Sequence, residues 1–161
     1  MAWSASKIFV STIEDVLEQT ATGIDLNLTT ADYYKAALFD NDITPDQTVS
    51  SANTAYGAGQ WVSAGNEVYD AAEWPVKGES LESVTFAPTT NVLKWDAADT
   101  VSTGTSATLA SVYGCLVYAE GATTPVADQG ISYHYFGGVQ SVTDGTFTIV
   151  WNSSGIFTLT L

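Results

Sequence analysis

The sequence predicts a mainly β protein, an antiparallel β-sandwich or jelly-roll-like single domain with one N-terminal α-helix. Apolar residues recur at helical spacing near the start of the chain, and from Ile24 onward they alternate with polar residues. Clusters of Gly, Pro, Asp, Asn and Thr separate the alternating segments, as turns do. A chain of 161 residues suits one domain, which we divide into an N-terminal segment, 1–22, and a β-rich body, 24–161.

The helix is expected from Ser6 to Gln19. Its apolar residues recur at helical spacing and the charged residues occupy other faces, the apolar ones being Phe9, Ile13, Val16 and Leu17. Gly23 lies just beyond the expected end, where glycine commonly terminates helices. The apolar face packs either on the domain's own core or on a neighbouring molecule.

The remaining elements are expected to be strands. The segments with strand patterns are 24–28, 33–39, 81–87, 91–97, 105–110, 112–120, 130–138 and a terminal hairpin, 145–161. In that hairpin Phe147, Ile149 and Trp151 share one face and are expected to pair with the face formed by Phe157, Leu159 and Leu161. The opposite faces carry threonines, as on a solvated sheet surface. Residues 51–80, rich in Ala, Gly, Asn and Ser, are expected to form a long connection with short turns.

The segment 112–118 differs because it is apolar on both sides. Such a strand is either central to the core or covered by another subunit. We therefore take it, together with one face of the helix, as the candidate contact surface, formed by Phe9, Ile13, Val112, Leu116 and Tyr118.

Charge narrows the possible functions. The chain has 18 acidic residues and 4 lysines, with no arginine, and its net charge is -14. Nucleic acids and anionic membranes bind to clustered cations, so neither partner is expected. The first twenty residues lack a basic leader and contain three acids, and no membrane span is apparent, so we expect synthesis in the cytoplasm without secretion. The single cysteine, Cys115, excludes an internal disulfide framework.

Residues for catalysis or for a cofactor are sparse. The one histidine, His134, shares a strand face with Ser132 and Phe136, and the sequence shows no partner nucleophile or carboxylate at an informative spacing. Cys115 lies in an apolar strand without a basic neighbour, where thiols are inert. Asp96 and Asp99 leave open a hydrolase, but turn formation explains them without chemistry and is the favoured interpretation. We therefore expect a protein that is not an enzyme and has no cofactor or metal site.

Five tryptophans leave a sugar-binding alternative open. Trp61 and Trp74 lie in the long connection, where an exposed indole ring can stack on a sugar. Trp95 and Trp151 lie in strands and are expected in the core.

Several phrases together resemble a group of small virion proteins of tailed bacteriophages, over nearly the whole chain from about Trp3 to Leu161. The phrases are ALFDNDITPD, AYGAGQW, VLKWDAADTVS, VYGCLVYAE, VADQGISYHYFGG and SVTDGTFTIVWNSSGIF. Proteins of this group serve as head decoration (cement) or minor structural components. The resemblance implies a virion protein and carries no catalytic residues.

The leading hypothesis is a decoration protein on the exterior of the phage particle, bound to the lattice of the major capsid protein and forming a homo-oligomer, with a trimer suited to three-fold positions. The alternative is a tail-associated module that recognises the host or binds carbohydrate through Trp61 and Trp74. A hydrolase that uses Asp96 or Asp99 is the third possibility.

Overall fold

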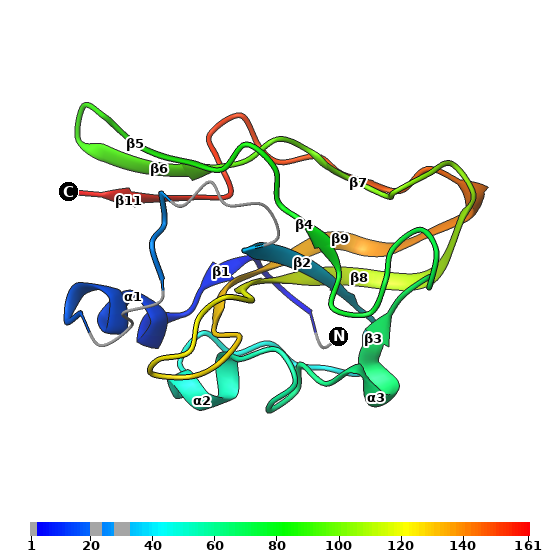
Figure 1. The fold of residues 1–161 in the computed structure, drawn as a ribbon, viewed down its shortest axis with the longest axis horizontal. Helices are drawn as coiled ribbons and strands as arrows, with labels where there is room; N and C mark the ends of the chain where they lie inside the picture. Colours follow the sequence, from blue (N-terminus) through cyan, green and yellow to red (C-terminus); the bar gives the residue numbers. More distant parts are fainter. Residues whose placement is uncertain (1–2, 20–23, 28–32) are drawn as a thin grey trace.

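The computed structural model describes residues 3–19, 24–27 and 33–161. It shows an antiparallel β-sandwich, in which helices and loops form a third layer on the free face of the larger sheet (Figure 1). The larger sheet forms the middle of the molecule, two smaller sheets lie above it in Figure 1, and short helices and loops lie below. The mainly β, antiparallel fold class predicted from the sequence is confirmed.

The larger sheet has the order β1-β9-β8-β2-β3, and β4 also pairs with β2. Its strands are β1 (Lys7–Ile8), β2 (Tyr34–Phe39), β3 (Glu67–Val68), β4 (Glu79–Ser80), β8 (Ala107–Ala119) and β9 (Gly130–Gly145). The predicted segments 105–110 and 112–120 are thus one long strand, β8.

The upper layer consists of two small sheets. One has the order β11-β6-β5, and the other pairs β10 with β7. The strands are β5 (Thr85–Thr89), β6 (Val92–Asp96), β7 (Thr100–Val101), β10 (Thr148–Ile149) and β11 (Phe157–Thr160). The helices below the larger sheet and beside it are α1 (Val10–Leu17), α2 (Ser51–Thr54) and α3 (Ser63–Asn66).

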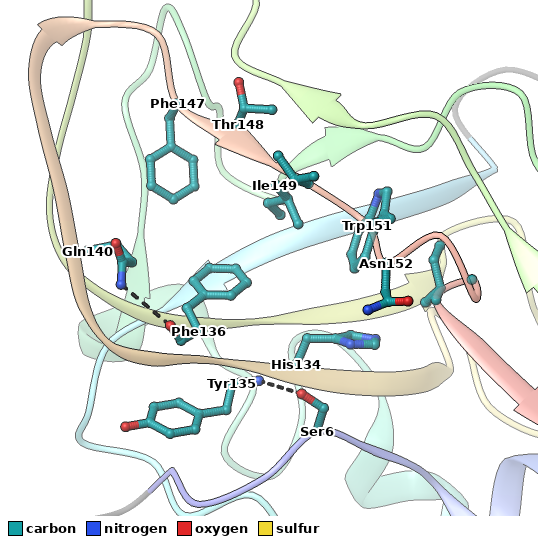
Figure 2. Close-up of a pocket in the computed structure, with 13 residues that line it drawn as sticks. Ser6, His134, Tyr135, Phe136, Gln140, Phe147, Thr148, Ile149, Trp151 and Asn152 are labelled. Atoms are coloured by element: carbon teal, nitrogen blue, oxygen red, sulfur yellow. Dashed lines mark hydrogen bonds between the residues drawn. The ribbon is translucent and has the colours of Figure 1, made fainter.

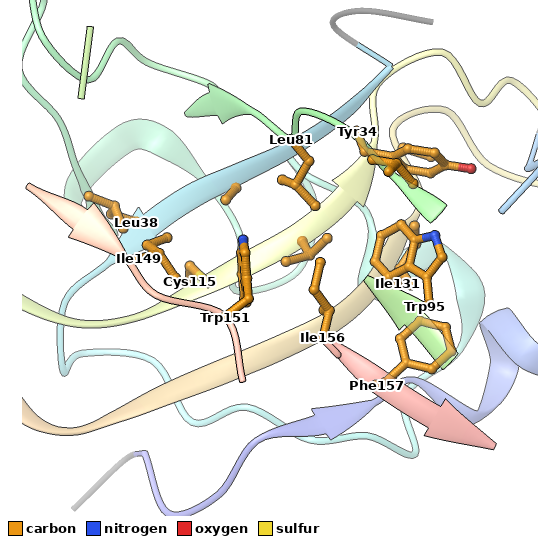
Figure 3. Packing of buried hydrophobic residues seen from close by; sticks show 14 of the residues in the cluster. Tyr34, Leu38, Leu81, Trp95, Cys115, Ile131, Ile149, Trp151, Ile156 and Phe157 are labelled. Carbon is orange, nitrogen blue, oxygen red and sulfur yellow. The ribbon is translucent and has the colours of Figure 1, made fainter. Parts of the chain in front are cut away.

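Hydrophobic residues fill both faces of the larger sheet. We call the cluster between the larger sheet and the small sheets the upper core; it includes Leu38, Cys115, Trp95 and Trp151 (Figure 3). The cluster on the other face, the lower core, is mostly aromatic: Trp3, Phe9, Ala37, Phe39, Ile43, Trp61, Leu116, Tyr118 and Tyr133. The side chains of β8 alternate between the two clusters, which explains why this strand is apolar on both sides. Of the two interpretations of segment 112–118, the structure supports a strand central to the core.

The N-terminal helix is shorter than predicted. Lys7 and Ile8 pair with Tyr133 and Ser132 of β9, and the helix begins only at Val10. The backbone N–H of Phe9 donates to the Ile131 carbonyl at 3.0 Å, which extends the sheet pairing up to the first turn of α1. Sheet pairing therefore overrides helical periodicity at the start of this segment. Gly23, the predicted terminator, lies outside the described residues.

The strand predicted for residues 24–28 is wrong for the part described, 24–27, and Leu28 lies outside the described residues. The Asp25 carboxylate accepts the N–H of Asn27 at 3.0 Å, which is the hydrogen bond of an Asx turn. Ile24 and Leu26 are nevertheless buried, and the Leu26 carbonyl accepts the indole N–H of Trp95 at 2.8 Å. The apolar alternation here reflects contacts with the upper core rather than strand pairing.

The prediction of a terminal hairpin over residues 145–161 is also wrong, although the predicted turn is present. The backbone N–H of Gly155 donates to the Asn152 carbonyl, and Gly155 has a φ of +100° that glycine readily adopts. The arms before and after this turn belong to different sheets, because β10 pairs with β7 and β11 pairs with β6. Both arms bury alternate residues in the upper core as predicted, except that Leu161 is exposed. Alternation identified the buried sides but not the pairing partners.

Replacing Leu116 by alanine tests the burial of β8. We expect Leu116→Ala to lower the free energy of unfolding by about 2–5 kcal/mol, because it removes apolar contacts and leaves a cavity in the lower core. The matched control is Val150→Ala, whose side chain is 73% exposed, with a change within about 0.5 kcal/mol. Urea denaturation measures both. Equal midpoints for Leu116→Ala and the native protein would contradict the burial of this residue.

Candidate functional site

The residues predicted to contact a partner are mostly buried within the chain itself. Phe9, Val112, Leu116 and Tyr118 have no exposed surface, and Ile13 alone is partly exposed. The prediction that these four form a contact surface is wrong, because the upper and lower layers of the same chain already cover both faces of β8. A buried side chain cannot reach another molecule without unfolding.

The predicted sugar-stacking tryptophans are also buried. Trp61 is 1% exposed and Trp74 has no exposed surface. Trp61 makes edge contacts with Trp3, Phe9 and Phe39 in the lower core, and Trp74 contacts the ring of Phe147 in the upper core. Residues 51–80 are therefore not an exposed loop, since parts of this segment pack on both faces of the larger sheet.

The three side chains with nucleophile or base chemistry, Cys115, Ser132 and His134, are buried or half-buried in the larger sheet. Burial raises the pKa of the Cys115 thiol, which opposes thiolate formation. The Oγ of Ser132 lies 2.9 Å from Nε2 of His134, the spacing of a nucleophile and its base. Ser132 is fully buried, however, and in the described part of the chain no carboxylate hydrogen-bonds to this imidazole. The pair has neither an exposed nucleophile nor an orienting acid.

Asp96 and Asp99 have structural partners. Asp96 pairs with the Lys94 ammonium at 2.7 Å, and the Asp99 carboxylate accepts the backbone N–H of Trp151 at 3.0 Å. Within residues 3–19, 24–27 and 33–161, no three His, Cys, Asp or Glu side chains are grouped as metal ligands would be. None of the helices described is both long and apolar enough to cross a membrane.

A groove of about 610 Å³ lies between β9 and the segment 147–156 (Figure 2). His134, Phe136 and Gln140 of β9 form one wall, and Phe147, Ile149 and Trp151 form the other. The groove exists because β9 belongs to the larger sheet and β10 to the upper layer, and the two strands do not pair with each other. A second hollow of about 260 Å³ shares Ser6, His134 and Ile156 with it.

A bulge in β9 shapes the first wall of the groove. Gly114 is paired with Tyr135 and Val112 with Gln140, so one residue of β8 lies opposite residues 136–139 of β9. Gly137 and Gly138 lie in this bulge with φ values of +79° and +154°, where a side chain would be strained although no atom lies within 4 Å of its Cβ position. Glycine is therefore favoured at both positions by the positive φ of the backbone and not by a lack of space for a side chain.

The polar groups of the groove are neutral. Desolvation lowers the pKa of His134 to about 4, so its imidazole is uncharged at neutral pH. Its ring meets Trp151 edge to face, with centroids 5.2 Å apart. The amides of Gln140 and Asn152 are exposed, at opposite ends of the groove in Figure 2.

Sequence reasoning did not find this groove. It placed Trp151 in the core and gave no role to Phe136, Gln140 or Asn152. The glycine pair at 137–138 within a predicted strand was the available signal, since glycines inside strands mark bulges. Which segment faces the bulge depends on long-range pairing and was not accessible from local patterns.

Comparisons of the chain with protein-family models, with curated proteins and with solved structures found no match.

Desolvation of the half-buried His134 imidazole makes the free energy of unfolding depend on pH. Above pH 6.5, the ordinary pKa, the imidazole is neutral in the folded and unfolded states. Between pH 6.5 and about 4 the unfolded chain binds a proton that the folded chain does not, so the free energy of unfolding falls by up to about 3 kcal/mol as the pH decreases.

NMR titration of the only histidine ring measures this directly, and we expect a midpoint near pH 4. Urea denaturation of the native protein and of His134→Gln over the same pH range gives the contribution of the histidine. The carboxylates titrate in both proteins, so their effect on the free energy of unfolding cancels in the difference. The difference in stability between them should shrink or reverse as the pH falls. A midpoint near 6.5 would contradict a desolvated imidazole.

Proposed function

We propose that this protein is a structural component of a bacteriophage virion, a decoration protein that binds the outside of the assembled head and stabilises it. The resemblance of its phrases to small virion proteins of tailed phages supports this proposal, as does the net charge of -14, which opposes binding to the packaged genome. The structural observation that carries it is the distribution of charge over the surface.

The outer face of the β5-β6-β11 sheet is nearly free of charge. Strand register places eight side chains on it, which we call the threonine face: Thr85, Ala87, Thr89, Val92, Lys94, Asp96, Thr158 and Thr160. Its two charged residues neutralise each other in the Lys94–Asp96 pair. The opposite side of the same sheet holds Trp95 and Phe157 in the upper core, so the threonine face points outward. Its threonines are exposed.

Carboxylates are exposed elsewhere. Glu14 and Glu18 lie on or next to α1, and Asp42 and Asp46 lie in the turn that follows β2, beside the lower core. Interface centres are depleted of charged residues, because burying an unpaired charge is costly. The threonine face can therefore lie against a capsid lattice while these four carboxylates remain in solvent. This face replaces the buried residues Val112, Leu116 and Tyr118 as the proposed contact surface.

Stabilisation of the shell would follow from linkage. A protein that binds only the assembled lattice stabilises it by about 2.7 kcal/mol per site at roughly a hundredfold excess over Kd. A homotrimer at three-fold positions would add avidity, because its copies would engage neighbouring subunits together. The partner in this proposal is the major capsid protein, and the location is the exterior of the particle.

The tail-associated carbohydrate module receives no support from its predicted residues, because Trp61 and Trp74 are buried. Likewise, the ion pair of Asp96 and the backbone bond of Asp99 account for both carboxylates without hydrolysis.

A new charge on the threonine face tests the proposal. Thr160→Glu places a carboxylate opposite Val92, away from the existing ion pair, and we expect it to weaken binding to undecorated heads at least about tenfold. The matched control, Thr44→Glu, adds the same charge at an exposed position beside the lower core and should bind like the native protein. Co-sedimentation with heads and the melting temperature of the decorated shell are the measurements.

Two outcomes would count against it. If the native protein neither co-sediments with heads nor raises their melting temperature, the decoration function is wrong. If Thr44→Glu weakens binding while Thr160→Glu does not, the lattice contact lies beside the lower core and the threonine face is not the contact.

A further inference from the structure

The groove between β9 and residues 147–156 has the composition of a ligand site. Binding pockets combine apolar and aromatic walls with a few polar groups that fix orientation, and they have volumes of about 300–1,000 Å³. The groove, at about 610 Å³, has Phe136, Ile149 and Trp151 along its walls. The amides of Gln140 and Asn152 lie at its two ends (Figure 2).

The absence of charge limits the class of ligand. Among the described residues that line the groove, none is Asp, Glu, Lys or Arg, although the chain contains 18 acids. The only titratable base of the lining, His134, is neutral at pH 7 for the reason given above. The groove lining offers no cation to a phosphate or carboxylate ligand and no carboxylate to a cationic one; the nearest lysine in the adjoining hollow, Lys7, is not part of this lining. The groove therefore favours an uncharged ligand.

The groove still has hydrogen-bonding capacity. The Gln140 amide nitrogen lies 3.4 Å from the Phe136 carbonyl and 3.5 Å from that of Gly138, both longer than an ordinary hydrogen bond. The Asn152 side chain uses its oxygen to accept the Ser154 N–H at 2.8 Å, which leaves its NH₂ group facing solvent or a ligand. Planar amides that donate and accept at both ends suit a ligand with hydroxyl groups along its length.

An extended polypeptide fits the groove less well. Strand addition needs a regular edge with evenly spaced donors and acceptors. The bulge at residues 136–139 interrupts the edge of β9 beside the groove, and the positive φ values of Gly137 and Gly138 turn the backbone away from a straight path. Just before the bulge, the outward N–H of Tyr135 already donates to the Ser6 hydroxyl at 3.0 Å. Bulges of this kind protect edges from pairing.

We propose that the groove binds a neutral saccharide, with its apolar C–H faces against the partly exposed Phe136 and the part of Trp151, 9% of its surface, that reaches the groove, and its hydroxyl groups on the amides of Gln140 and Asn152. A sugar ring combines these two kinds of surface in one molecule. The exposed Gln140 and Asn152 side chains lie at its two ends in Figure 2, so it would hold part of an oligosaccharide chain. This site is separate from the threonine face and does not depend on the decoration function.

Titration of the full chain with neutral oligosaccharides tests the site. The probes are cello-, malto-, xylo- and chito-oligosaccharides, with hyaluronan fragments as the charged comparison, followed by ¹H–¹⁵N NMR and calorimetry. We expect at least one neutral probe to bind with a millimolar or tighter Kd and to shift the amide signals of Gly137, Gly138 and Asn152. Hyaluronan should not bind.

Variants connect the binding to the groove. Gln140→Ala should weaken it about threefold to tenfold, the effect of losing one hydrogen bond. Asn91→Ala, which removes an exposed amide at the β5–β6 turn, should leave it unchanged. Gln140 makes only long hydrogen bonds in the fold, so its replacement should preserve the NMR spectrum outside the groove.

Four results would overturn the proposal: no saturable binding of any neutral probe, equal binding by Gln140→Ala and Asn91→Ala, shifts confined to another surface, or hyaluronan binding as tightly as the neutral probes. An uncharged extended peptide of alternating Thr and Val is the remaining probe. If it shifts the groove signals while the oligosaccharides do not, the groove is a peptide site instead.

Discussion

The burial of β8 on both faces is the constraint on which the rest of the structure depends. Its side chains alternate between two hydrophobic clusters, so the chain must supply a covering layer on each side of the larger sheet. The upper layer comes from residues 85–101 and 147–160, and the lower layer from the N-terminal segment and residues 40–62. Segments far apart in sequence are thereby drawn onto one strand pair, β8 and β9.

This three-layer arrangement buries most of the tryptophan residues in its two cores. Trp3, Trp61, Trp74 and Trp95 are all internal, so the aromatic content of the chain measures the size of its two cores rather than an exposed binding surface. The exposed surface includes the neutral threonine face on the upper layer and carboxylates on and around α1 and the lower layer, while Glu82 and Asp99 are exposed beside the upper layer. The lack of unpaired charge on the threonine face itself suits that face to protein contact.

The groove arises where the layers separate. Beyond its contact with β1, the outer edge of β9 has no strand partner among the described residues, and the chain that crosses above it, 147–152, pairs with β7 instead. The bulge at Gly137 and Gly138 lies in the wall that β9 contributes, and the ring of Trp151 from the other wall meets that of His134 edge to face. A concave site without charged lining residues thus forms at the open side of the sandwich.

The sequence alone determined the fold class, the inward and outward sides of most strands, and the acidic surface, because strand alternation and charge are local properties that each residue carries with it. It could not determine that Trp61 and Trp74 are internal or that Lys7 and Ile8 form a strand. Nor could it determine that β10 and β11 belong to different sheets. Those outcomes depend on which distant segments offer backbone partners and apolar surface. Only tertiary pairing decides them, and the groove between β9 and residues 147–156 exists solely as its result.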